Sequence, residues 1–383
     1  MNTRVDAWFG KGAVSPLQVV ENIAFTDSSL VPIWHKVLAG ERLGLEDGLR
    51  LLETNDLCAL GRMADYVKSQ VLDHQDRVFF VLNRQVNATN ICVLTCSFCD
   101  FAKKPGDPGA YEMSMEDILD HVTDEIREVH MTGGHHPDWT FEHYEDIVRT
   151  IHETYPHTQV KAFTAAEIDY FYKRWKIPPE ESLARFKAAG LQSMPGGGSE
   201  VFSDRVRKEL FPGKNTAGRW LEIHRIAHNM GIPSNATLLY GHIETFQERV
   251  EHMLMLRELQ DETGGFLAFI PLEYQVGDTH LVPRQASAID DLKTIAAARL
   301  ILDNFPHIKA YWIMIGEETA SIALNFGASD LDGTIGKERI AHAAKAASPI
   351  GLARDRMVNL IRDAGKVAVE RDALYNVVQV YEN

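Results

Sequence analysis

Eight short apolar runs alternate with longer amphipathic stretches from about residue 78 onward. The runs cover residues 78–86, 129–133, 160–164, 191–195, 234–240, 266–272, 308–315 and 322–326. Continuous apolar strands separated by helices are typical of a parallel sheet with both faces covered, and eight such units favour a closed barrel. The pattern predicts an α/β fold. It consists of a (β/α)8 TIM-type barrel over 76–335, an N-terminal helical extension over 1–75 and a C-terminal helical segment over 336–383 packed on the barrel.

The net charge and the hydropathy of the chain indicate which classes of binding partner it can have. The formal net charge is −15, which argues against nucleic acid, because phosphate binding needs a basic face. A small anionic substrate stays compatible, since a local cluster of cations can override the global charge. No apolar run reaches the ~18–20 residues that span a membrane, and the first residues lack the apolar stretch of a secretory signal. We therefore expect a cytoplasmic protein with no membrane partner.

Three of the four cysteines crowd into one segment after the first predicted strand. Cys92, Cys96 and Cys99 have the spacing C-x3-C-x2-C, with Phe98 directly before the last thiol. Thiolates normally hold an iron–sulfur cluster with one ligand per iron, so three of them on a [4Fe–4S] cluster leave one iron open to chelate S-adenosylmethionine. Cys58 lies in a predicted helix and is expected to be a small buried apolar residue.

A zinc knuckle with His135 as fourth ligand is the structural alternative for this segment. Structural zinc sites usually add a second pair of ligands, and no such pair follows the cysteines. The spacing, placed after the first strand of a barrel, resembles the radical SAM superfamily. A non-enzymatic iron–sulfur or zinc-binding module stays open as a distant alternative.

Glycine-rich and polar residues follow several of the predicted strands, where barrel active sites lie. The resemblance implies that a loop after the second strand and another after the fourth bind S-adenosylmethionine as co-substrate. The candidates for this binding are Phe98, Thr132, Gly133, Gly134, Gly197, Ser199, Glu200 and Arg207, with Lys214 as a further cation.

Several longer segments carry a closer resemblance. They cover residues 87–92, 134–138, 161–168, 195–200, 220–224, 239–245, 265–272 and 327–334. Together they resemble the aminofutalosine synthases of the futalosine route to menaquinone. Two sister families share much of the pattern, namely cyclic dehypoxanthinylfutalosine synthase and the deazaflavin-cofactor synthase. The chain departs from the expected pattern at His135, where an apolar residue is usual, and at Ser199, where alanine is usual.

The resemblance implies a defined reaction. The 5′-deoxyadenosyl radical adds to the enol-ether double bond of 3-[(1-carboxyvinyl)oxy]benzoate, and the adduct loses its carboxylate carbon as carbon dioxide or bicarbonate to give 6-amino-6-deoxyfutalosine. A reductant such as flavodoxin or ferredoxin supplies the electron. A substrate with two carboxylates needs cations or hydrogen-bond donors in a dry site. The candidates on predicted loops are Arg84, His136, His242 and Arg284 for the carboxylates, with Asn87 and Glu167 orienting these groups or the ribose.

Overall fold

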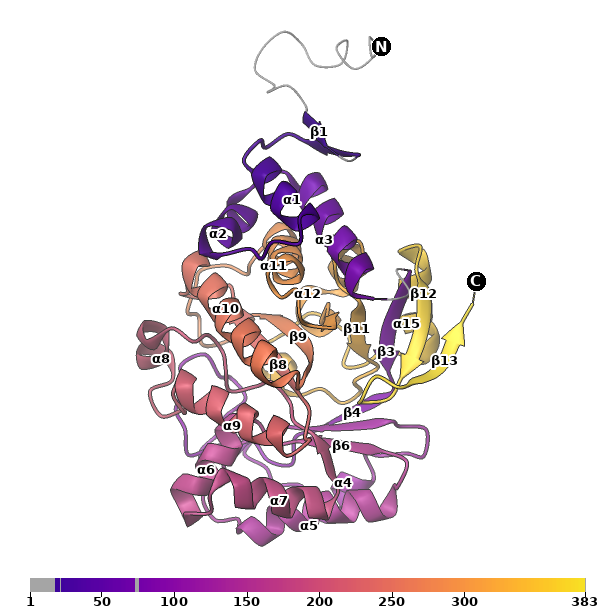
Figure 1. The fold of residues 1–383 in the computed structure, drawn as a ribbon. Helices are drawn as coiled ribbons and strands as arrows, with labels where there is room; N and C mark the ends of the chain where they lie inside the picture. Colours follow the sequence, from indigo (N-terminus) through magenta and orange to yellow (C-terminus); the bar gives the residue numbers. More distant parts are fainter. Residues whose placement is uncertain (1–17, 21, 73–75, 383) are drawn as a thin grey trace.

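Eight parallel strand positions form a ring in the computed structural model, which describes residues 18–20, 22–72 and 76–382 (Figure 1). The first position is split into two strands on either side of Leu82. The strands of the ring are β3 (Arg77–Val81) with β4 (Asn83–Val86), β5 (Glu128–Met131), β6 (Gln159–Ala162), β7 (Leu191–Ser193), β8 (Ser234–Tyr240), β9 (Phe266–Glu273), β10 (His307–Ile308) and β11 (Asp330–Gly333).

Two single-residue bridges close this ring. Strands β4 to β7 pair in sequence order, and so do β8 to β10. Met194 bridges to Ser234, which links β7 to β8, and Lys309 bridges to Asp330, which links β10 to β11. Because β11 pairs in turn with β3, every position of the ring has two neighbours. The predicted (β/α)8 barrel is confirmed.

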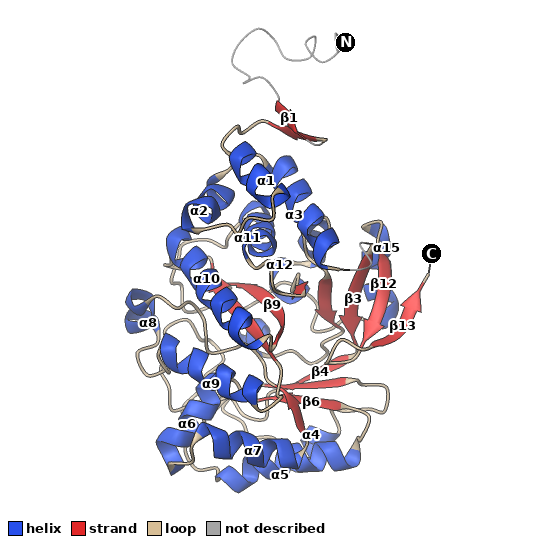
Figure 2. Ribbon diagram, in the orientation of Figure 1, coloured by secondary structure: helices blue, strands red, loops and turns tan. Residues whose placement is uncertain are grey.

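Helices cover the outside of the ring (Figure 2). They are α4 (Met115–Leu119), α5 (Phe141–Thr154), α6 (Ala165–Trp175), α7 (Pro179–Ala189), α8 (Asp204–Leu210), α9 (Ala217–Asn229), α10 (Phe246–Thr263), α11 (Ala288–Ile301), α12 (Trp312–Ile315) and α13 (Glu317–Ala323). Most of the longer ones start at a Ser or Thr whose hydroxyl accepts a backbone N–H of the first turn, as in α5, α6 and α10, which satisfies a donor that the helix itself leaves free.

Three helices and a two-stranded hairpin precede the barrel. They are β1 (Gln18–Val20), β2 (Ile23–Phe25), α1 (Leu30–Leu38), α2 (Leu45–Glu53) and α3 (Leu57–Val71). Asp56 caps α3 by accepting the backbone N–H of Ala59 at 3.1 Å. Cys58 lies at the exposed start of α3, so the expectation that it is buried is wrong. Residues 1–17 of the predicted extension lie outside the described residues.

The last two predicted strands are misplaced. The run over 322–326 falls at the end of α13 and beyond, and Ile322 is exposed. The eighth strand is β11, whose inward residues Asp330 and Asp332 are buried carboxylates and therefore give no apolar signal. The run over 308–315 holds the short β10 and then α12.

The segment after the barrel contains strands as well as the expected helices. Its elements are α14 (Ile340–Ala343), α15 (Arg354–Asp363), β12 (Val367–Arg371) and β13 (Val377–Tyr381). Strand β12 pairs in parallel with β3, with Val367 opposite Arg77, whereas β5 pairs with β4. The split first strand thus has β12 beside its N-terminal half, β3, and β5 beside its C-terminal half, β4 (Figure 1).

Buried charges fill the barrel floor below the strand ends. Glu128, Lys161, Lys309, Asp330, Asp332 and Arg371 are each at most 3% exposed. The Nε of Arg371 donates to Asp330 at 2.7 Å. Lys161 lies 2.5 Å from Glu128 and Lys309 lies 2.5 Å from Asp332. We call these six residues the ion layer. Its three cations balance its three anions.

Arg371 makes the ion layer depend on the C-terminal segment, because it is contributed by β12. We predict that Arg371→Met lowers the free energy of unfolding by about 3–5 kcal/mol, since Asp330 then stays buried and charged without its partner. Arg356→Met removes an exposed ion pair to Glu317 and should cost at most about 1 kcal/mol. Denaturant unfolding of both variants beside the unsubstituted chain measures the difference. Equal losses would contradict this role for the ion layer.

Candidate active site

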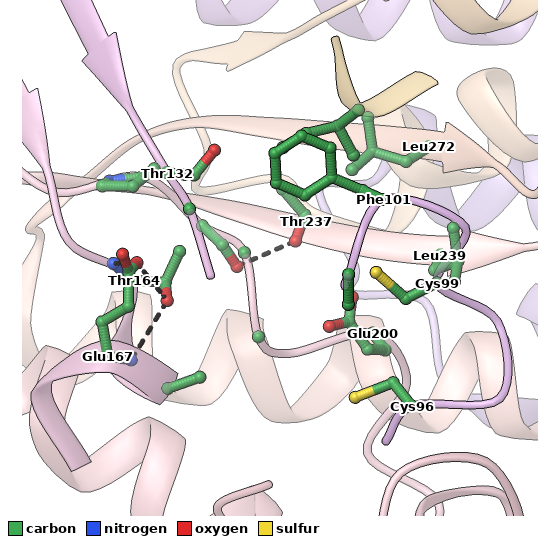
Figure 3. A pocket seen from close by; sticks show the side chains of 18 of the residues that line it. Cys96, Cys99, Phe101, Thr132, Thr164, Glu167, Glu200, Thr237, Leu239 and Leu272 are labelled. Carbon is green, nitrogen blue, oxygen red and sulfur yellow. Dashed lines mark hydrogen bonds between the residues drawn. The ribbon is translucent and has the colours of Figure 1, made fainter. Parts of the chain in front are cut away.

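A cavity of about 280 Å³ opens at the carboxyl ends of the strands. Cys92, Cys96 and Cys99 line it together with both glycine-rich loops, and Figure 3 shows Cys96 and Cys99 beside Glu200. The remaining wall is largely apolar. Active sites of (β/α)8 barrels lie at this face, so the cavity is the candidate active site.

Backbone and lysine contacts hold the cysteine loop in place. The N–H of Cys92 donates to the carbonyl of Lys103 at 2.9 Å, and the N–H of Val93 donates to the carbonyl of His135 at 3.0 Å. The ammonium group of Lys104 donates to the carbonyls of Cys92 and Leu94 at 2.8 and 2.7 Å. The loop is therefore fixed both to its own return segment and to the loop after β5.

The three thiols fit a cluster better than a single ion. Among the described residues no group of three or more His, Cys, Asp or Glu side chains converges as the ligands of one metal ion do. A four-iron cube places each thiolate on a different iron, so its ligands need not converge. Burial raises the pKa of Cys96 to about 11, against the opposing charge of Lys214. Binding of a cluster would therefore displace protons from the loop.

Two glycines allow the cysteine loop to lie against the loop after β5. A Cβ on Gly134 would overlap the carbonyl of Ile91, and one on Gly133 would lie 3.1 Å from the carbonyl of Thr89. The N–H of Gly134 donates to the same Thr89 carbonyl at 2.9 Å. Both glycines, with Thr132, line the cavity.

The loop after β7 approaches its neighbours just as closely. A Cβ on Gly197 would lie 3.0 Å from the Thr164 side chain, and one on Gly198 would lie 2.8 Å from Ala166. Gly197 lines the cavity. Ser199 does not: it is fully buried, and its hydroxyl donates to the carbonyl of Thr237 at 2.7 Å.

An ion pair borders the cavity beside the thiols. Glu200 and Lys214 form a salt bridge, and both line the cavity. Glu200 has a positive φ of 45°, a strained conformation for a residue with a side chain. Lys214 lies 5.1 Å from the centre of the Phe98 ring. The pair brings one cation and one anion within reach of a zwitterionic ligand.

Arg207 lies behind this loop, outside the set of residues that line the cavity. Its guanidinium donates to the carbonyls of Ser199 at 2.7 Å and of Val201 at 3.3 Å, and also to that of Asn215. It therefore positions the loop after β7 and does not itself face the cavity.

Two further expected residues lie at the strand ends. Glu167 lines the cavity, and its carboxylate accepts the N–H and the hydroxyl of Thr164 at 2.7 and 2.8 Å. Burial raises the pKa of Glu167 to about 7 despite these hydrogen bonds. Asn87 is outside the lining, and its amide donates to the carbonyl of Thr132 at 2.8 Å.

The residues expected to bind the substrate carboxylates do not line the cavity. The guanidinium of Arg84 lies against Gly336, because Arg84 alternates with the inward residues of β4. His136 stacks on Trp139 and accepts the backbone N–H of Asp138 at 3.1 Å.

The two remaining candidates for the carboxylates also point elsewhere. The His242 side chain is fully buried between Glu244 and the carbonyl of Leu239, at 3.0 and 3.1 Å. Arg284 is exposed in the loop after β9. The lining of the cavity therefore includes none of the four side chains expected to meet the substrate carboxylates, Arg84, His136, His242 and Arg284.

The cavity contains polar residues that the sequence analysis did not single out. They include Gln85, His130, Tyr311, Asp332 and Glu338. Three of them are inward residues of β4, β5 and β11. Strand alternation was the available signal for Gln85, because adjacent residues of a strand point to opposite faces and Gln85 follows Arg84 directly. His135, the departure from the family pattern, also lines the cavity, and burial lowers its pKa to about 3.

Comparisons with known proteins agree with this geometry. Residues 86–256 match the radical SAM superfamily model, and residues 263–383 match the CofH/MqnC C-terminal region. The chain is 46% identical over 365 residues to the aminodeoxyfutalosine synthase of Thermus thermophilus, which covers 93% of this chain and 98% of that protein. The chain belongs to the aminodeoxyfutalosine synthase family of radical SAM enzymes. Members of that superfamily use a [4Fe–4S] cluster and S-adenosylmethionine.

Other relatives are less similar to this chain. The Streptomyces coelicolor aminodeoxyfutalosine synthase is 39% identical, with 91% of this chain and 93% of that protein covered. The cyclic dehypoxanthine futalosine synthase of the same organism is 36% identical, with 93% and 90% covered. The crystal structure of methylornithine synthase superposes with a TM-score of 0.71 at 17% identity over 87% of this chain and 96% of that chain, which supports the barrel fold.

The first prediction for this site concerns the thiols. Changing Cys92, Cys96 or Cys99 to Ala should remove the ~400 nm absorption of the cluster and its iron, because two thiolates cannot hold the cube with one iron already open. Cys58→Ala should retain both, since Cys58 lies in α3, away from the cavity. Iron analysis and absorption spectra of anaerobically reconstituted protein make the test. Full iron in any of the three loop variants would refute the ligand assignment.

The second prediction concerns the contact between loops. Gly134→Ala should displace the cysteine loop, because the added Cβ overlaps the Ile91 carbonyl, and should lower the iron bound per chain. Gly218→Ala is the matched control, because a Cβ at this position in α9 meets nothing within 4 Å and alanine is the better helix former. Unchanged iron content in Gly134→Ala would show that the close approach is not required.

Proposed function

We propose that this chain is an aminodeoxyfutalosine synthase. It joins the 5′-deoxyadenosyl group of S-adenosylmethionine to 3-[(1-carboxyvinyl)oxy]benzoate and forms 6-amino-6-deoxyfutalosine, a step of menaquinone biosynthesis. Methionine is released, and the enol-ether carboxyl carbon leaves as carbon dioxide or bicarbonate. The observation that carries the proposal is the 46% identity over nearly the full length of both chains to a protein of that name. Identity to the cyclic dehypoxanthine futalosine synthase is lower, at 36%.

The cavity supports a radical reaction of this kind. When bound, the [4Fe–4S] cluster supplies the electron that cleaves S-adenosylmethionine to methionine and the 5′-deoxyadenosyl radical. Cys92, Cys96 and Cys99 would hold the cluster. Glu200 and Lys214 lie beside the thiols, where they can meet the charged groups of S-adenosylmethionine.

The lining of the cavity also protects a reactive species. Phe101, Leu239, Ile270, Leu272 and Met314 form its apolar wall. Such a wall excludes water and keeps a carbon radical from quenching by side reactions. The apolar wall is also a suitable surface for packing against the benzene ring of the substrate.

The proposed function also includes an electron donor and a cellular compartment. A flavodoxin or ferredoxin would supply the electron, and the compartment would be the cytoplasm, because three crowded thiols need reducing conditions to stay available for a cluster. Within the described residues, no helix has the length and apolar character needed to cross a membrane.

Turnover provides the direct test. Reconstituted protein incubated anaerobically with reductant, S-adenosylmethionine and 3-[(1-carboxyvinyl)oxy]benzoate should form 6-amino-6-deoxyfutalosine. Methionine should appear in equal amount, since S-adenosylmethionine is consumed and not regenerated. Mass spectrometry of the products quantifies both. Cyclic dehypoxanthinylfutalosine formed from dehypoxanthinylfutalosine, with no product from the benzoate, would reassign the chain to the sister family.

A further inference from the structure

The cavity must accept a substrate with two carboxylates, yet no arginine lines it among the described residues. Its one lysine, Lys214, is already paired with Glu200 beside the thiols. A carboxylate without partners in such a site would cost several kcal/mol. The substrate anions must therefore be met in part by uncharged donors.

Two uncharged polar side chains lie side by side at the base of the cavity. Gln85 on β4 and His130 on β5 are direct partners in the parallel register, and both line the cavity. The Nδ1 of His130 is buried without a hydrogen-bond partner in the described part of the chain. No hydrogen bond of the Gln85 side chain occurs there either, so both groups are available to a ligand.

The charges around the pair are balanced, so an anion here depends on hydrogen bonds. Lys161 on β6 is the register partner of His130, but its ammonium group is paired with Glu128 at 2.5 Å in the ion layer. Asp332 faces the same cavity from β11 and would repel a carboxylate from that side. Burial lowers the pKa of His130 to about 3, so its imidazole is neutral and offers one N–H.

The opposite wall suits the rest of an aromatic acid. In the order of the ring, β8 and β9 lie across the barrel from β4 and β5. They contribute the apolar residues Leu239, Ile270 and Leu272, and Phe101 of the cysteine loop lines the same cavity (Figure 3). A ring placed between these walls would direct a carboxylate toward Gln85 and His130.

The depth of Gln85 and His130 along their strands decides which of the two substrate carboxylates they can meet. Gln85 lies inside β4, below the strand end from which the cysteine loop departs, and His130 lies one inward position below Thr132. The enol-ether group has to face the adenosyl group near the thiols. The ring carboxylate then points toward the barrel floor.

We propose that Gln85 and His130 form a subsite that binds the ring carboxylate of the substrate through an amide and an imidazole N–H. This inference rests on the proposed function, because it takes its substrate from there. It assigns specificity for a benzoate, as opposed to a neutral aryl group, to the β4–β5 pair.

Wild-type holoenzyme gives the first test. Calorimetric titration should show that 3-[(1-carboxyvinyl)oxy]benzoate binds at least about tenfold more tightly than the corresponding benzamide, as expected for hydrogen bonds to a charged group. Equal dissociation constants would show that no carboxylate subsite exists. This measurement needs no variant and so does not depend on whether a substituted chain folds.

Variants then locate the subsite. Gln85→Leu should raise the KM and dissociation constant of the benzoate about 10- to 100-fold, with kcat much less affected. Gln85→Glu should reverse the preference, because its carboxylate repels the benzoate and accepts the benzamide N–H. His130→Phe should act like Gln85→Leu. Iron content and S-adenosylmethionine cleavage without substrate should stay unchanged in all three.

Gln70→Leu, at an exposed position of α3, is the matched control and should change none of these quantities. If the wild type makes 6-amino-6-deoxyfutalosine but Gln85→Glu keeps the wild-type preference, the subsite is wrong and the proposed function stands. If the wild type does not turn over the benzoate, the proposed function fails and the subsite fails with it.

Discussion

The ion layer is the interaction on which the rest of the barrel depends. Barrels of this class usually fill their interior with branched apolar side chains. Here six buried charges occupy the floor, and each needs its partner because an unpaired charge at this depth is strongly destabilising. Arg371 from β12 and Asp330 from β11 join the C-terminal segment to the ring. The layer also fixes the lower limit of the cavity and places Asp332 at its base.

The apolar runs predicted the fold well where strands are buried on both faces. The predicted bounds of β8 match the observed ones, and those of the other strands up to β9 differ by a few residues. They failed at β11, whose inward positions are carboxylates, and at β12, which lies in a segment expected to be helical. Burial of paired charges cannot be recognised from hydropathy, because the partners come from distant parts of the sequence.

The sequence likewise predicted one part of the candidate site and missed another. Cysteine spacing and glycine pairs place the thiols and both glycine loops in the cavity, since local sequence determines loops of this kind. Side-chain direction is a different property. Arg84 and Gln85 are adjacent, and strand alternation sends only one of them inward. His242 is kept out of the cavity for a second reason, because its imidazole contacts the carboxylate of Glu244, two residues later in the sequence. Loop position alone does not reveal either outcome.

The split first strand has a consequence for biosynthesis. Strand β3 emerges early from the ribosome, but its parallel neighbour β12 is encoded near the other end of the sequence shown. At ordinary translation speeds of 5–20 residues per second, the interval between them is roughly 15 seconds to a minute. Throughout that time the edge of β3 that pairs with β12 is open, and its other partner, β11, also follows late in the sequence. Exposed strand edges invite pairing with other chains. Cover of this edge by a chaperone or by helices of the nascent chain would prevent such pairing until the barrel closes.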